Sequence, residues 1–362
     1  MINPEAISVL VVDDSQVTRE FLTHVFSEAG IKVIKALPDG QEAVEFVKRQ
    51  RPDVITMDIY MPGMNGLEAT RQIMGTNPVP IVIVSGNWDP GEVDMTFSAM
   101  EAGALAVVRR PYGIGHPEHA ASVRELVKIV RLMSEVKVVR RWSRSGPEFS
   151  WKPALPPVPE RARTHIGREI KLVAVGASAG GPPVLQRILS GLNADLPFPL
   201  LIVQHMAPGF LPGMLNWLGE TSRLRLSMAQ DGGAILPGNA YFAPDGLHMG
   251  VSGDDAVSLS PGEPEHGARP SISYLFRSVA RAFDGNAAAV LLTGMGNDGA
   301  AEMKSLKERG AVTIAQDKES SAVYGMPEAA AQLDAATMVL SPEQITAAIN
   351  RFAKKWPPGE NR

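Results

Sequence analysis

The sequence contains no cysteine among its 362 residues, and it has no long apolar run. Without cysteine, disulfide bonds and thiolate chemistry are excluded, and a reducing cytoplasm fits the composition. No stretch approaches the roughly 18 consecutive apolar residues that a membrane-spanning helix requires. The first residues lead directly into an apolar run at 7–12, without the basic segment and cleavage site of a secretory signal. We therefore expect a cytoplasmic protein that does not insert into a membrane.

An excess of positive charge is also missing, because 35 lysines and arginines face 39 aspartates and glutamates, giving a net charge of −4. Proteins that bind nucleic acid or anionic membranes concentrate basic residues. We therefore expect no nucleic-acid partner. The composition is otherwise that of a globular protein, with 44% hydrophobic and 20% charged residues. At roughly 150 residues per domain, the chain is long enough for two domains.

Five short apolar runs in the first part of the chain alternate with segments whose apolar residues recur at helical spacing. Ser15 follows the first run and a pair of aspartates, and serine is a favoured residue for capping a helix. Regular alternation of strands and helices is typical of α/β domains with a parallel sheet. We predict a flavodoxin-like domain with a five-stranded parallel sheet, whose strands lie at 9–12, 32–36, 53–57, 80–84 and 105–108.

Acidic residues stand where the predicted strands end. Asp13 and Asp14 follow the first strand, and Asp58 follows the third. Functional side chains of such sheets gather beyond the carboxyl ends of the strands, and clustered carboxylates suit Mg²⁺. One carboxylate can accept a phosphoryl group while the metal ion neutralises the transferring charge. The alternative, that an aspartate only caps the helix after it, stays open for any one of them.

Taken together, these residues resemble a two-component receiver domain. The resemblance is carried by Asp13-Asp14, by the segment from Met57 to Gly66, and by Ser85-Gly86 and Arg110-Pro111. It implies that Asp58 is the phosphoacceptor and that Ser85 and Arg110 are the receiver's switch residues. It also implies a set of Mg²⁺ ligands, namely Asp13, Asp14, Asp58 and the backbone carbonyl of Tyr60.

Two positions depart from the receiver pattern. Arg110 stands where the family carries lysine, and Val107 stands where an aromatic switch residue is expected. Arginine keeps the positive charge and can grip phosphate with two nitrogens, but its rigid fork is not interchangeable with an ammonium group. We still expect phosphorylation of the receiver. The two departures bear on how phosphorylation is coupled to the rest of the protein.

A helix and a proline-rich segment connect the two parts of the chain. The apolar spacing predicts a helix over 120–139, and five prolines follow within 143–160. Proline-rich segments of this kind act as extended, semi-rigid linkers. We predict a receiver domain at 1–125, a helical and proline-rich linker at 126–168, and a catalytic domain at 169–355.

The second domain opens on a serine in a turn of small residues. An apolar run at 171–175 leads into Gly176-Ala-Ser178-Ala-Gly180-Gly181, and a helix is expected to begin near Pro182. A serine on such a strand-to-helix corner stands clear of the backbone, and glycines allow positive φ and close packing. The helix start should also leave N–H groups that favour negative charge. An ordinary glycine-rich turn after a strand remains the alternative at this point.

Two further apolar runs of this domain end in residues that complement a serine. The run at 199–203 is followed by His205, and the run at 287–292 is followed by a glycine-rich turn containing Asp298. A serine hydroxyl needs an imidazole to take its proton and a carboxylate to orient that imidazole. Taken singly, His205 can be an interior histidine, and Asp298 can cap the helix predicted at 300–308. At three matching strand ends, the three residues favour an acyl-transfer triad.

Dinucleotide binding is the main alternative, because residues 176–181 approach the glycine-rich loop of that fold. Two features oppose it. Ser178 occupies the place of the glycine that admits pyrophosphate, and the next strand ends in Gln204 and His205 and not in an acid for a ribose.

The second domain resembles the catalytic domain of the CheB family of chemotaxis response-regulator protein-glutamate methylesterases. The motifs that carry the resemblance are 176–181, 204–206, 241–244 with 248–249, 269–271 with 275–279, 293–299, 315–317 and 325–328. A receiver joined by a linker is also the family's architecture. The resemblance implies Ser178 as nucleophile, His205 as base, Asp298 as its orienting acid, and the Met295 N–H in an oxyanion hole. Ala179 departs from it, since threonine is usual there.

The resemblance also implies the reaction and the partners. The expected reaction is hydrolysis of glutamate γ-methyl esters, and deamidation of glutamines, on methyl-accepting chemotaxis receptors. Phosphorylation of the receiver by the chemotaxis histidine kinase, with Mg²⁺, is expected to control it, and the esterase itself is expected to need no cofactor. We expect a monomer. The alternative is a phosphorylation-controlled binding protein whose hydrolase fold no longer turns over.

Overall fold

The structure is a computed structural model, and it describes residues 7–86, 90–136, 138 and 169–353. The chain divides into two compact units, Met1–Glu148 and Phe149–Arg362. Each unit is described by itself below. The proline-rich part of the predicted linker, at 143–160, lies outside the described residues.

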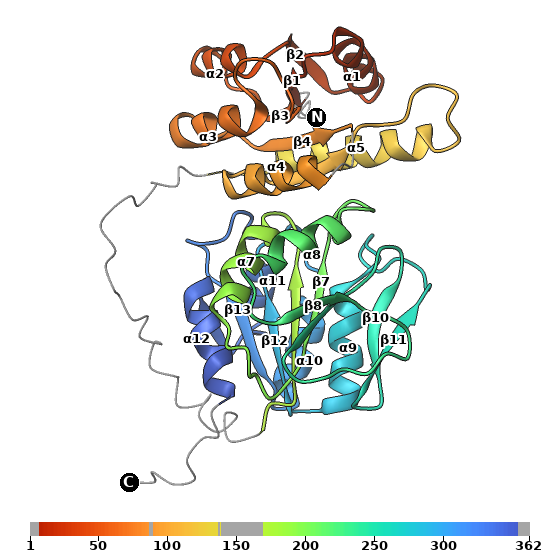
Figure 1. Cartoon of the computed structure of the whole chain (residues 1–362), viewed down its shortest axis with the longest axis vertical. Helices are drawn as coiled ribbons and strands as arrows, with labels where there is room; N and C mark the ends of the chain where they lie inside the picture. Colours follow the sequence, from red (N-terminus) through yellow and green to blue (C-terminus); the bar gives the residue numbers. More distant parts are fainter. Residues whose placement is uncertain (1–6, 87–89, 137, 139–168, 354–362) are drawn as a thin grey trace, which may run out of the picture. The chain divides into compact units, whose positions relative to one another are not determined.

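The first unit is built on the predicted five-stranded parallel sheet, in the order β2-β1-β3-β4-β5 (Figure 1). The strands are β1 (Ser8–Val12), β2 (Lys32–Leu37), β3 (Val54–Met57), β4 (Ile81–Ser85) and β5 (Ala106–Arg109). The helices are α1 (Gln16–Glu28), α2 (Gly40–Arg49), α3 (Gly66–Thr76), α4 (Pro90–Glu101) and α5 (His119–Ser134). The order places β1 and β3 side by side, so that the ends carrying the acids are adjacent.

Local sequence explains how these elements begin and pack. The Ser15 side chain caps α1 by accepting a hydrogen bond from the Thr18 N–H, as predicted. Helix α5 is shorter than the predicted 120–139, and it packs against β3, β4 and β5 through buried Leu126, Val130 and Met133. The predicted receiver boundary at residue 125 falls inside this helix.

The second unit contains a seven-stranded parallel sheet in the order β14-β13-β12-β6-β7-β9-β8. Its strands are β6 (Leu172–Ala177), β7 (Leu200–Gln204), β8 (Arg225–Met228), β9 (Asn239–Phe242), β12 (Ala287–Leu291), β13 (Val312–Gln316) and β14 (Met338–Leu340). A separate antiparallel hairpin joins β10 (His248–Ser252) and β11 (Ala256–Ser260). The helices are α7 (Gly181–Gly191), α8 (Leu211–Gly219), α9 (Ile272–Phe283), α10 (Ala300–Glu308), α11 (Met326–Gln332) and α12 (Pro342–Phe352).

The three predicted strands are β6, β7 and β12, and they lie together at the centre of this sheet. All of their residues are buried, as continuous apolar runs in a parallel sheet require. The predicted α/β fold is therefore confirmed for both units. Strands β8, β9, β13 and β14 and the β10–β11 hairpin are not predicted. β8 is an edge strand whose residues are partly or fully exposed, and β9 alternates in burial, whereas β13 is fully buried and enters the sequence analysis only through the motif at 315–317.

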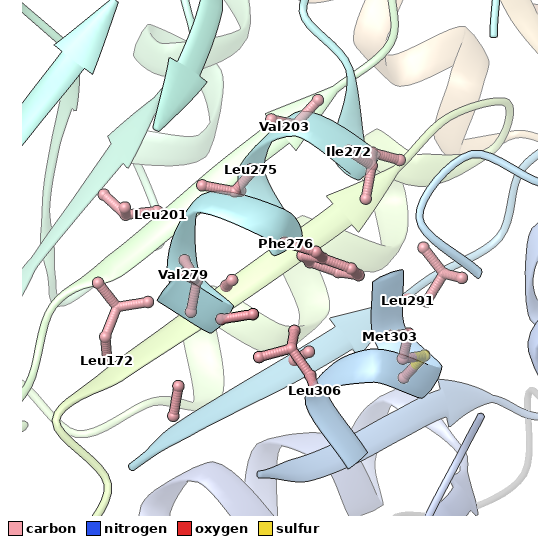
Figure 2. Close-up of a cluster of buried hydrophobic side chains, with 14 of the residues drawn as sticks. Leu172, Leu201, Val203, Ile272, Leu275, Phe276, Val279, Leu291, Met303 and Leu306 are labelled. Carbon is pink, nitrogen blue, oxygen red and sulfur yellow. The ribbon is translucent and has the colours of Figure 1, made fainter. Parts of the chain in front are cut away.

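A cluster of buried apolar side chains fixes helix α9 against the sheet (Figure 2). The members labelled in the figure come from β6, β7 and β12, from α9 and from α10, and they are Leu172, Leu201, Val203, Ile272, Leu275, Phe276, Val279, Leu291, Met303 and Leu306. This packing holds the N-terminal end of α9 beside the carboxyl ends of the central strands. Among the described residues, no helix has the length and apolarity needed to cross a membrane.

Candidate active site and phosphorylation site

The carboxyl ends of β12, β6 and β7 lie next to one another, with β6 in the middle. Ala177, the last residue of β6, pairs with Gln204, the last residue of β7. The His205 N–H donates to the Ala177 carbonyl at 2.9 Å, and the Ser178 N–H donates to the Thr293 carbonyl at 3.0 Å. The structure thus brings the backbone of Ser178 beside both the His205 segment and the turn that contains Asp298.

The serine corner is held by glycine and by one short hydrogen bond. Gly180 adopts a left-handed conformation with φ of 73°, as predicted for the turn, and the Gly181 N–H donates to the Ser178 carbonyl at 2.8 Å. Helix α7 begins at Gly181 and continues with Pro182 and Pro183, which carry no N–H. The helix start therefore offers fewer free donors than expected from the sequence, and the oxyanion donors have to come largely from elsewhere.

Asp298 is buried and is held by the first turn of α9. Its Oδ1 accepts from the Ser271 hydroxyl at 3.0 Å and from the Ser273 N–H at 2.9 Å, and its Oδ2 accepts from the Ile272 N–H at 2.7 Å. Asp298 does not cap α10, whose N-cap is Gly299 without a side-chain hydrogen bond. The carboxylate is instead seated at the start of a different helix, where free N–H groups favour an anion.

The pKa of Asp298 reflects this environment. Burial would raise the pKa of its carboxyl group, but the contact with His205 and the hydrogen bonds from Ser273 outweigh burial and hold the pKa well below its usual range. The carboxylate is therefore ionised at neutral pH.

His205 lies against this carboxylate. Its Nε2 is 3.0 Å from Oδ2 of Asp298, with 18% of the histidine side chain and 5% of the aspartate side chain exposed. The distance is within hydrogen-bonding range, although the contact does not meet the geometric criteria for a hydrogen bond. Catalytic hydrogen bonds are often poorly aligned before substrate binds. With Nε2 at the carboxylate, Nδ1 is the ring nitrogen left to exchange a proton.

The loop that contains Met295 passes directly over the serine. A Cβ added at Gly294 would lie 2.6 Å from the Ser178 Cβ, so only glycine fits there. The Gly294 N–H is bound to the Val323 carbonyl, and the Gly294 carbonyl accepts from the Gly325 and Met326 N–H groups. Within the part of the chain that the structure describes, no acceptor contacts the Met295 N–H. This donor is thus available beside the serine, where the resemblance to the CheB family implies an oxyanion hole.

Several residues of this site are not assigned a role by the sequence analysis. Thr293 joins two loops, since its hydroxyl donates to the Ala179 carbonyl at 3.0 Å and accepts from the Val323 N–H at 2.9 Å. The segment Ser271–Ser273 binds the Asp298 carboxylate, and the sequence contains a signal for the helix start at this segment. Ser271 is a favoured capping residue, and apolar residues follow it at helical spacing, at 272, 275, 276, 279, 280 and 283.

In the first unit, the structure brings together the three acids that the sequence singles out. One oxygen of each of Asp13, Asp14 and Asp58 lies within 4.8 Å of the others. Nη2 of Arg110 donates to Asp13 at 3.1 Å and to Asp58 at 3.2 Å. Three convergent carboxylates fit a hard divalent cation such as Mg²⁺, and Arg110 balances part of their charge.

The electrostatics of Asp58 differ from those of Asp298. Burial and the neighbouring charge of Asp13 raise the pKa of Asp58 to about 6, while Arg110 and the Ile59 N–H act in the opposite direction. Burial also raises the pKa of Asp13. A bound cation would lower the pKa of both carboxyl groups by stabilising their charged forms.

A cavity of about 300 Å³ opens beside Asp58. Its lining includes Tyr60, Arg110 and Tyr112, and Arg109 lies with its guanidinium 4.5 Å from the centre of the Tyr112 ring. Ser85 is buried at the end of β4, where its carbonyl accepts from the Arg110 N–H at 2.7 Å. Of the two predicted switch residues, Arg110 contacts the predicted phosphoacceptor, and Ser85 ends β4, the strand that pairs with β3.

The two units define a class of protein, in which a receiver-type domain precedes an α/β domain that carries serine, histidine and aspartate at one sheet edge. The response regulator receiver domain model matches residues 9–120, and the CheB methylesterase model matches residues 173–349. The chain belongs to the family of CheB methylesterases with an N-terminal receiver.

Relatives cover almost the whole chain. A protein-glutamate methylesterase/protein-glutamine glutaminase of Nitrosospira multiformis is 53% identical over 350 residues, which is 96% of this chain and 97% of the relative. A protein of Geobacter metallireducens with the same description is 53% identical over 349 residues, covering 96% and 99%. The crystal structure of the Thermotoga maritima CheB methylesterase catalytic domain is 33% identical, covers 50% of this chain and 98% of its own, and has a TM-score of 0.49.

Proposed function

We propose that this protein hydrolyses methyl esters of glutamate side chains on chemotaxis receptors, using Ser178, His205 and Asp298. The observation that carries the proposal is the ionised Asp298 carboxylate 3.0 Å from the His205 ring, at strand ends that adjoin Ser178. The names of the full-length relatives supply the substrate class.

In the proposed reaction each group has its own step. Oγ of Ser178 bonds to the ester carbonyl carbon while His205 takes the serine proton, and Asp298 stabilises the resulting imidazolium. The Met295 N–H donates to the oxyanion of the tetrahedral intermediate, a contact of this kind being worth roughly 3–4 kcal/mol. The carbon–oxygen bond to the methoxy group breaks, and His205 returns the proton so that methanol leaves.

Water completes the reaction by the same groups. His205 takes a proton from water, whose oxygen bonds to the acyl carbon, and Ser178 leaves with the proton returned. The products are methanol and a glutamate carboxylate. With glutamine as substrate, the leaving group is ammonia, and the acyl intermediate is the same. Deamidation therefore needs no further catalytic residue.

The receiver is proposed to control this activity through phosphorylation of Asp58 by the chemotaxis histidine kinase. Asp13, Asp14, Asp58 and the Tyr60 carbonyl would hold Mg²⁺, which supplies charge neutralisation for phosphoryl transfer. The contacts of Arg110 with Asp13 and Asp58 support a role for Arg110 in binding phosphoryl oxygens, and Ser85 is proposed to sense them.

Hydrolysis in ¹⁸O-labelled water tests the reaction class. Methylated receptor membranes and the full chain should yield methanol, and the glutamate carboxylate should gain ¹⁸O while methanol gains none. Labelled methanol would show cleavage at the methyl carbon and contradict acyl transfer. No methanol above a protein-free control would favour the binding protein with an inactive hydrolase fold.

A further inference from the structure

We propose that Gln204 is a positioning residue that fixes the nucleophile and the base relative to each other. The inference rests on the proposed function, because it assigns Ser178 and His205 those roles. The two amide hydrogens of Gln204 go to the two catalytic segments. Nε2 donates to the Ser178 carbonyl at 2.9 Å and to the His205 carbonyl at 2.7 Å.

The hydrogen bond from Gln204 to the His205 carbonyl replaces a backbone hydrogen bond that is lost where β6 ends at the serine corner. In a parallel pair, hydrogen bonds alternate along both strands, and the last one here joins the His205 N–H to the Ala177 carbonyl. The next would join the residue-179 N–H to the His205 carbonyl. The chain leaves β6 at Ala177 to form the serine corner, so that N–H is not in place. The Gln204 side chain supplies the missing donor.

The surroundings of Gln204 hold its amide in this orientation. The residue is 7% exposed, and a Cβ on Gly181 would lie 2.1 Å from its Oε1. Among the described residues, Oε1 is buried without a hydrogen-bond partner. Burying an unpaired amide oxygen is unfavourable, so this side chain is not explained as an optimised element of the core. Its two donated hydrogen bonds account for its place.

Loss of the amide should affect catalysis more than folding. The Ser178 carbonyl would keep the Gly181 N–H, but the His205 carbonyl would lose its donor at the strand end. The base would then be free to shift away from the serine. A displacement of about 1 Å in a catalytic group can cost roughly 100-fold in rate.

The test is the rate at which a fluorophosphonate labels Ser178 in the full chain. In this reaction Oγ bonds to phosphorus, fluoride leaves, and the serine proton passes to His205. The assay needs no receptor, so it reports nucleophile and base alone. We expect Gln204→Met, which preserves length without donors, to lower kinact roughly 10- to 100-fold with KI unchanged. Gln204→Asn keeps an amide donor on a side chain that is shorter by one methylene group, and it should give an intermediate kinact. This variant tests the proposal if the methionine variant does not fold.

Asn350→Leu is the matched control. Asn350 also joins two backbone groups through its amide, since it donates to the Gly191 carbonyl at 2.9 Å and accepts from the Asn193 N–H at 2.9 Å, away from the site. Its loss should lower the melting temperature and leave kinact unchanged. If wild-type Ser178 is not labelled, the proposed nucleophile is wrong. If wild type is labelled and both Gln204 variants match its kinact, only the positioning role is overturned.

Discussion

Asp298 shows how one carboxylate serves both the fold and the proposed chemistry. In the part of the chain that the structure describes, its carboxylate contacts His205 and three donors from the start of α9. An asparagine would have to turn its NH₂ group toward at least one of these donors, because every neighbour of the carboxylate is an N–H or O–H group. The site therefore requires an acid and not merely a polar residue of the same size.

Asp298→Asn should lower kcat by on the order of 10³- to 10⁴-fold, because the imidazole loses the charge that orients and stabilises it. Steady-state methanol release measures the change, and circular dichroism checks that the variant is folded. A fall of less than tenfold in a folded variant would mean that Asp298 does not support the base.

Asp58 gives a prediction about stability and pH. Its pKa is about 6 in the folded protein against an ordinary value of 3.8. The folded state therefore binds the Asp58 proton more tightly than the unfolded chain does. In the absence of Mg²⁺, the contribution of Asp58 protonation to the free energy of unfolding is fully present below pH 4. It declines as the pH rises to about 6, and it does not change at higher pH.

Asp58→Asn should remove that decline, since asparagine is neutral throughout. In EDTA, the first unit of the variant should be more stable than that of wild type, and the difference in free energy of unfolding should grow from pH 4 to pH 6.5 to about 3 kcal/mol. The melting temperature of the variant should therefore exceed that of wild type by an amount that increases over the same pH range. Mg²⁺ should reduce the difference by stabilising wild type. Parallel pH profiles for the two proteins would contradict a raised pKa at Asp58.

At this scale, the sequence points to the residues of the proposed triad but not to the groups that hold Asp298. Ser178, His205 and Asp298 each follow an apolar run, so they can be predicted from strand ends alone. The three donors to Asp298 lie 25 to 27 residues earlier in the chain. They meet it only because α9 packs on the sheet, and no local pattern contains that information.

Among the elements, α9 links packing to the site. Its apolar side is buried against β6, β7 and β12, and its first turn binds the Asp298 carboxylate (Figure 2). Ser271 has two roles there, because its hydroxyl accepts from the Tyr274 N–H as the helix cap and donates to Asp298.

Ser271→Ala and Ser341→Ala form a matched pair that separates these roles. Both serines cap a helix, Ser341 through a capping box at the start of α12. Each change should cost about 1 kcal/mol of stability by denaturant unfolding. Only Ser271→Ala should also lower kcat, by severalfold, since only its hydroxyl contacts Asp298. Equal kcat values for the two variants would argue against a catalytic contribution from the α9 turn.

The elements themselves are predicted unevenly. The sequence places β6, β7 and β12 to within two residues, and the predicted helix at 300–308 coincides with α10. These elements carry continuous apolar runs or clear helix limits. The exposed β8 and the β10–β11 hairpin carry neither, since their pairing depends on contacts with distant segments.

For the whole molecule, the two-unit organisation follows from the change in composition near the proline-rich segment and from the two sets of motifs. The receiver and the catalytic unit each carry a complete candidate site within their own residues. Communication between the sites is therefore a separate property from either chemistry, and it can be tested separately.

Asp58→Asn should leave basal methanol release unchanged and abolish its stimulation by a small phosphodonor with Mg²⁺. The reason is that the amide cannot form the acyl phosphate, while the serine, histidine and aspartate of the second unit are untouched. The ratio of rates with and without phosphodonor is the measurement. A variant that is still stimulated like wild type would show that another residue accepts the phosphoryl group.

The central claim is that Ser178 is the nucleophile of a glutamate methylesterase, and the initial rate of methanol release from methylated receptor membranes tests it most directly. Ser178→Ala removes only the hydroxyl oxygen. The variant should remain folded and take up phosphate at Asp58 like wild type, while its rate of methanol release falls by on the order of 10³-fold or more. Methanol release at the wild-type rate from the folded variant would contradict the assignment.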